Sequence, residues 1–130
     1  MPNPRTADFQ FRQSGDALRE AENLYTAGYW AACVSNAYQT VLRAAAGLLY
    51  GQGVRPQTER EVRIGFAAAF VSSGLAAATH DRAFRTLEKL RHQADYEHEH
   101  TTTNEEATLA LRLARDFHAE AQRLRKEGLK

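Results

Sequence analysis

The chain has 130 residues, of which 43% are hydrophobic and 25% are charged, and its formal net charge is +1. These values are typical of an ordinary globular protein, so we expect one domain over residues 1–130, and the near-zero charge indicates little about partners. The single cysteine, Cys33, excludes an internal disulfide and favours a reducing, cytoplasmic location. Residues 29–50 form the longest apolar-rich run, but polar side chains interrupt it, which argues against a membrane span.

The first half of the chain predicts two helices after a short irregular lead at residues 1–5. Apolar residues at helical spacing predict the first helix over residues 6–27, and Gly28 is placed to end it. The second helix is predicted over residues 29–50. It is apolar round most of its circumference, so we expect it at the centre of the fold.

Two capping boxes mark helix starts in the second half. Thr58 with Glu61 predicts a third helix that runs to about residue 73, and Thr79 is the expected N-cap of the fourth. Thr103 with Glu106 predicts the start of the fifth helix.

We expect residues 126–130 to be a frayed tail, and no segment alternates with the period of a β-strand. The predicted fold is all-α, an up-and-down helical bundle of four main helices plus a leading helix.

A polar stripe crosses the otherwise apolar second helix. Asn36, Thr40 and Arg43 follow one another at spacings of four and three residues, so they share one face. We expect a buried hydrogen-bond network there, and one wall of a cleft is the alternative.

The stretch from Arg82 to His100 contains a charged trio on a packing face. At about 100° per residue, the apolar residues of this helix fall in one sector, and Arg91 projects into that sector. Asp95 follows one turn later, and His98 almost eclipses Arg91 if the helix continues through Glu97.

The sequence lacks the motifs of several common catalytic and binding sites. It has no glycine-rich phosphate loop, paired cysteines or nucleophile elbow. The Glu-His-Glu-His run at residues 97–100 lacks a dedicated ligand spacing, so we expect no metal site and no cofactor.

An arginine followed by a histidine after four to six intervening residues is the signature of the HEPN superfamily, whose name stands for higher eukaryotes and prokaryotes nucleotide-binding. Three pairs match here, and helical geometry selects one, because only Arg91 and His98 share a face beside the packing sector. The other two pairs are Arg85 with His92 and Arg112 with His118.

The wider context resembles a small bacterial and archaeal HEPN branch with an R-x-x-A-D-Y signature. Residues 91–96 read RHQADY, and the second and fifth helices resemble those of the branch in composition and order. Two departures are Gln57-Thr58-Glu59, where the branch often has Lys-Thr-His, and Gln39, where an aromatic residue is expected.

The resemblance implies a homodimer that acts as a metal-independent endoribonuclease, toxin-like in a toxin-antitoxin or defence system. His98 would then be the general acid or base, and Arg91 would bind the scissile phosphate. Asp95 would orient Arg91 and Tyr96 would contact the RNA, with Asn36 and Arg43 as supporting residues.

The alternative is a non-catalytic HEPN module that binds a nucleotide or a nucleotidyltransferase antitoxin. In that case Arg91 and Asp95 form a structural pair beneath the dimer interface, and His98 is a loop residue.

Overall fold

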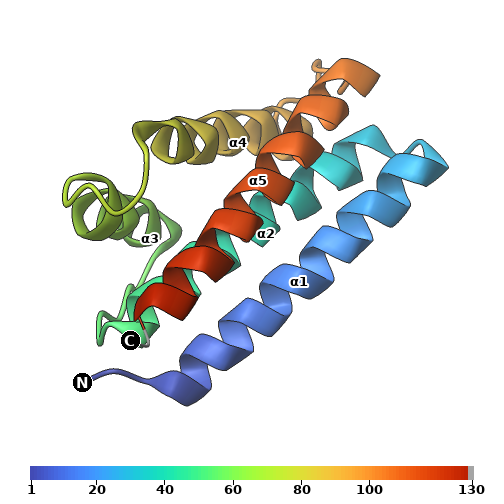
Figure 1. Cartoon of the computed structure of the whole chain (residues 1–130). Coiled ribbons are helices and arrows are strands. Elements are labelled where there is room, and N and C mark those ends of the chain that lie inside the picture. Colours follow the sequence, from blue (N-terminus) through green and yellow to red (C-terminus); the bar gives the residue numbers. More distant parts are fainter. Residues whose placement is uncertain (129–130) are drawn as a thin grey trace.

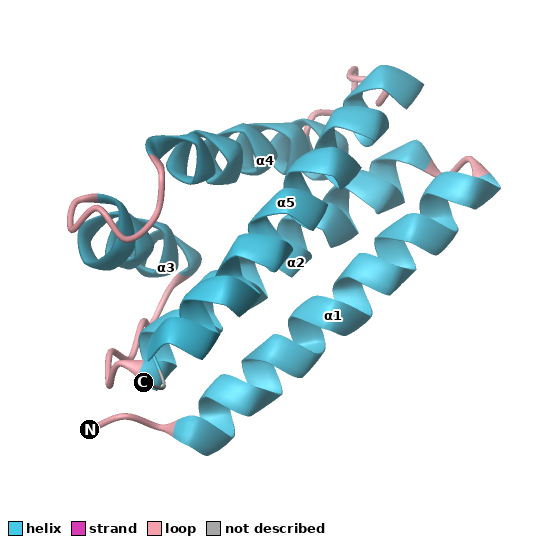
Figure 2. Ribbon diagram, in the orientation of Figure 1, coloured by secondary structure: helices cyan, strands magenta, loops and turns pink. Residues whose placement is uncertain are grey.

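A computed structural model describes residues 1–128, which form five α-helices and a short π-helical segment, with no β-strand (Figures 1 and 2). The all-α prediction is therefore confirmed. None of the described helices is long and apolar enough to cross a lipid bilayer. The elements are α1 (Pro4–Ala27), α2 (Trp30–Gly51), α3 (Glu59–Phe66), the π-helical segment η1 (Ala67–Val71), α4 (Ala78–Tyr96) and α5 (Asn104–Gly128).

Helix α2 is the centre of the bundle, as its apolar circumference predicts. It packs against α1, α3, α4 and α5. Figure 1 shows α1 antiparallel to α2, α5 running in the same direction as α2, and α4 at a steep angle to α5 on the side away from α1. The short α3 lies beside the C-terminal half of α2 and leads through η1 into α4 (Figure 2).

Both predicted capping boxes are present. The backbone N–H of Glu61 donates to Thr58 Oγ1 at 3.1 Å, and that of Glu106 donates to Thr103 Oγ1 at 3.1 Å. Each glutamate carboxylate accepts from a backbone N–H ahead of the helix, that of Gln57 or Thr103, so local sequence alone defines the starts of α3 and α5.

The predicted boundary at the N-terminus needs correction. Asn3 caps α1 by accepting from the N–H of Thr6, so the irregular lead covers three residues instead of five. Proline at the first helical position needs no backbone donor, so Pro4 begins the helix.

Two further boundaries differ from expectation. Ala77 is the N-cap of α4, and Thr79 lies inside the helix, where it caps nothing. The third helix changes to π geometry at Ala67 and ends at Val71. Helix α5 continues through Gly128, and the rest of the expected frayed tail, residues 129–130, lies outside the described part of the chain.

An aromatic cluster joins α3, α4 and α5 to α2. The ring centroids of Phe66 and Phe117 are 4.9 Å apart, and Phe84 lies 5.8 Å from Phe117. Tyr38 of α2 contacts this cluster edge-on, 6.2 Å from Phe84, and is 1% exposed. Packing therefore fixes the Tyr38 ring, while its hydroxyl reaches the gap between α3 and α4.

Candidate functional site

Arg91 is held at the junction of three helices. Its guanidinium lies over the Tyr38 ring, 4.4 Å from the ring centroid, and its Nη2 donates to Glu59 Oε1 at 2.6 Å. The same carboxylate oxygen accepts from the Tyr38 hydroxyl at 3.0 Å. Helix α2 thus supplies the aromatic face, α3 the carboxylate and α4 the cation.

The electrostatics of this cluster keep Arg91 charged and Tyr38 protonated. Burial acts to lower the pKa of Arg91, but the Glu59 carboxylate and Tyr38 outweigh burial, so the Arg91 pKa is raised. Burial, together with the bond to Glu59, raises the pKa of Tyr38, which therefore stays protonated and remains a donor.

An open groove of about 580 Å³ lies over this cluster between α3 and α4. Of its basic side chains, Arg85 pairs with Asp81 and Arg91 with Glu59. Arg60 and Lys89 are exposed and form no ion pair with any carboxylate of residues 1–128. The remaining lining residues are Tyr38, Glu59, Glu88, His92, Gln93 and Glu97.

Asp95 and Tyr96 both lie near Arg91. Asp95 Oδ2 is 4.0 Å from Arg91 Nη1, a loose pair, while Asp95 Oδ1 accepts from the hydroxyl of Ser35 on α2. The Asp95 side chain therefore ties α4 to α2 more firmly than it orients Arg91. The Tyr96 ring is 60% exposed, 5.7 Å from the Arg91 guanidinium and 5.4 Å from the His92 ring.

His98 lies beyond the end of α4, so the expected helical alignment with Arg91 is wrong. The helix ends at Tyr96, and Glu97 takes an extended conformation with φ −99° and ψ 100°. Carboxylates at residues 97 and 99 are unfavourable at the negative end of a helix dipole. His98 is an exposed loop residue, and its catalytic role stays a prediction.

His100 anchors the loop that follows α4. Its Nε2 lies 3.1 Å from Glu106 Oε2, which ties the loop to the first turn of α5. Burial acts to raise the pKa of Glu106, but its bonds to Thr103 and His100 outweigh burial and lower it. The loop is therefore anchored at His100, two positions after the candidate catalytic residue His98.

The polar stripe on α2 does not form the expected buried network. Asn36 Nδ2 donates to Ala32 O at 3.0 Å, and Arg43 Nη1 donates to Gln10 Oε1 at 3.3 Å. Thr40 is buried and donates to Asn36 O. The cleft-wall alternative holds for two of the three, because Asn36 and Arg43 line a shallow depression of about 360 Å³ between α1 and α2.

Glu59 and Tyr38 are the site residues that sequence reasoning missed. They lie on different helices, 21 positions apart in sequence, and Glu59 lies 32 positions before Arg91. Helical periodicity cannot indicate such pairs. The signal available was the departure at Glu59 from the Lys-Thr-His pattern, which places an acid where a base is common.

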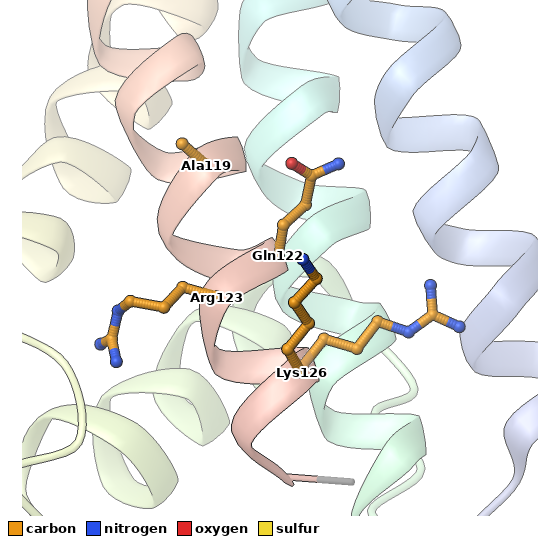
Figure 3. Close-up of a pocket in the computed structure, with 5 residues that line it drawn as sticks. Ala119, Gln122, Arg123 and Lys126 are labelled. Atoms are coloured by element: carbon orange, nitrogen blue, oxygen red, sulfur yellow. The ribbon is translucent and has the colours of Figure 1, made fainter.

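A larger depression, of about 700 Å³, lies at the C-terminal end of α5 (Figure 3). Two of its three cations are already paired: Arg123 with Glu120 and Glu127, and Arg125 with Asp8. Figure 3 shows Arg123 pointing away from Gln122 and Lys126. This depression therefore lacks the convergent groups of a site, and we assign the candidate site to the α3–α4 groove.

Within residues 1–128, no group of three or more His, Cys, Asp or Glu side chains is placed to hold a metal ion.

Comparisons with known proteins place this fold. The chain resembles the crystal structure of TT1696 from Thermus thermophilus with a TM-score of 0.80, at 22% identity over 94% of this chain and 99% of that one. At this identity the likeness shows the fold. No curated protein matches the sequence. The family model of the HEPN domain matches residues 7–124, and the chain therefore belongs to the HEPN family.

Proposed function

We propose that this HEPN domain binds a nucleotide or single-stranded RNA in the α3–α4 groove, without itself requiring a metal. The proposal depends on Arg60 and Lys89, two cations beside the Arg91 cluster that form no ion pair within residues 1–128. Phosphate groups bind such cations, and the exposed rings of Tyr96 and His92 offer faces on which a base can stack.

Fluorescence anisotropy with a labelled single-stranded RNA tests the binding proposal. Lys89→Ala removes a groove cation, so the RNA affinity should fall about fivefold at about 0.1 M salt, the effect of losing one phosphate contact of a single strand. Arg112→Ala on the exposed side of α5 is the matched control and should bind as the wild type does. Equal loss in both variants, or in neither, would exclude the groove as the binding site.

A second candidate is the metal-independent endoribonuclease, and the exposed position of the His98 imidazole just after the Arg91 helix favours it. In this function Arg91 stabilises the phosphate and His98 transfers the proton. An exposed loop histidine can meet the Arg91 of a second copy, which makes a homodimer part of this proposal. A nucleotidyltransferase antitoxin is the proposed protein partner.

Incubation of the protein with structured and unstructured RNA in excess EDTA tests the nuclease. Cleavage by the wild type, lost in Arg91→Ala and in His98→Ala, is the expected result. Cleavage by all three proteins would indicate a contaminant, and no cleavage by any of them would leave binding as the function. Light scattering at micromolar concentration tests the dimer, which a monomeric mass would contradict.

A further inference from the structure

Glu59 is the anion that Arg91 and Tyr38 bind together. It is the first residue of α3, and its Oε1 accepts from both Arg91 Nη2 and the Tyr38 hydroxyl, at 2.6 Å and 3.0 Å. Arginine recognises carboxylates and phosphates with the same fork of donors, so the two anions compete for one place.

The two donors are more buried than the carboxylate that accepts from them. Tyr38 is 1% exposed, and the Arg91 side chain is 19% exposed and stacked on the Tyr38 ring. The Glu59 side chain is 47% exposed and stands at the start of a helix. Glu59 can therefore turn into solvent while Arg91 and Tyr38 keep their positions.

Arg91 also has spare donor capacity. Its Nε is buried and has no hydrogen-bond partner within residues 1–128. A carboxylate that contacts Nη2 alone leaves this donor unsatisfied, whereas a phosphate has three or more acceptor oxygens. A phosphate in place of Glu59 has enough acceptors for both the free donor and the Tyr38 hydroxyl.

We propose that Glu59 is a built-in anionic competitor, and that a ligand phosphate binds Arg91 by displacing the Glu59 carboxylate. This inference rests on the proposed function of the α3–α4 groove. Glu59 then sets a threshold for binding: a ligand must offer an anion that outcompetes an adjacent carboxylate, which favours phosphate esters over weaker anions.

Titration with inorganic phosphate, followed by the Arg91 Nε–H signal in ¹⁵N NMR, tests the competitor directly. Ionic strength is held constant with chloride, and Arg91→Lys assigns the signal. Glu59→Gln keeps an oxygen acceptor for Tyr38 but removes the charge, so phosphate should bind about tenfold more tightly than to the wild type. Glu59→Ala is a second variant that should show the same gain.

Glu97→Gln is the matched control, because Glu97 lines the same groove and its loss changes the net charge equally. It should change phosphate affinity by less than about twofold, since Glu97 does not contact Arg91. Equal gains in Glu59→Gln and Glu97→Gln, or no saturable response of the Arg91 signal in any variant, would overturn the competitor.

The experiments distinguish failure of the Glu59 displacement proposal from failure of the proposed RNA binding in the α3–α4 groove. RNA binding that is lost in Lys89→Ala keeps the proposed function even where Glu59→Gln shows no gain for phosphate. If Glu59→Gln gains phosphate affinity but the protein binds no RNA, the role of Glu59 as a competitor is supported and the nucleic-acid ligand is contradicted.

Discussion

Ser14 illustrates how one residue links three helices, and it does so through His118 of α5 and Thr40 of α2. The buried hydroxyl of Ser14 on α1 donates to Thr40 O of α2 at 2.7 Å, and His118 Nδ1 of α5 lies 2.9 Å from the same Ser14 Oγ. Because the Ser14 hydrogen is already used, we assign the hydrogen of this contact to His118 Nδ1. The imidazole is half-buried, and burial, with Arg19 acting in the same direction, lowers the pKa of His118.

This lowered pKa gives a signed pH dependence. Above the ordinary pKa of 6.5, His118 is neutral in both states and its titration does not affect stability. As the pH falls below that value, the unfolded chain binds a proton that the folded chain resists, so the free energy of unfolding decreases. His118→Asn keeps a donor near the Nδ1 position and removes the titration.

We therefore expect urea denaturation to show a smaller loss of stability in His118→Asn than in the wild type between about pH 7.5 and 5.5. His92→Asn, at an exposed position on α4, is the control and should follow the wild type. Parallel curves for all three proteins would contradict the role of His118.

The contact between helices α1 and α2 depends on one glycine. A Cβ at Gly47 would lie 2.8 Å from Cε2 and 2.9 Å from Cδ2 of Phe11, closer than side chains approach one another. Phe11 is itself confined, since the Arg125 guanidinium lies 4.4 Å from its ring centroid. At Gly51, in the last turn of α2, a Cβ would meet nothing within 4 Å.

Gly47→Ala should therefore destabilise the fold by about 1 kcal/mol, because overpacking costs about 2 kcal/mol and alanine contributes roughly 1 kcal/mol as a better helix former. Gly51→Ala receives the same propensity gain without the clash, so it should be neutral or slightly stabilising. Chemical denaturation of both variants measures the difference, and equal stabilities would show that α1 moves away at little cost.

The sequence predicts the elements whose boundaries depend on residues close together in the chain. The starts of α3 and α5 depend on side chains three residues apart, as in Thr58 with Glu61, and the sequence predicts them. The end of α4 depends on the His100 contact with Glu106 and on Glu97, so periodicity extended the helix too far. The Arg91 partners, Glu59 and Tyr38, come from other helices, and only the fold brings them together.

At the scale of the whole molecule, charge is balanced and binding must be local. The net charge is +1, and most described arginines near the two main depressions are paired with carboxylates. A general attraction for nucleic acid is therefore small, and the groove supplies two unpaired cations plus Arg91 once Glu59 is displaced.

The salt dependence of RNA binding should reflect this small number. With two or three phosphates neutralised, the slope of log K against log salt should be about −1.4 to −2.1, at about −0.7 per phosphate of a single strand. Lys89→Gln should reduce the magnitude of the slope by about 0.7, because it removes one groove contact. Lys126→Gln, in the depression at the end of α5, removes the same charge and should leave the slope unchanged. Anisotropy titrations over a range of salt concentrations measure all three slopes. A smaller slope in Lys126→Gln alone would indicate that RNA binds at the end of α5 and not in the groove.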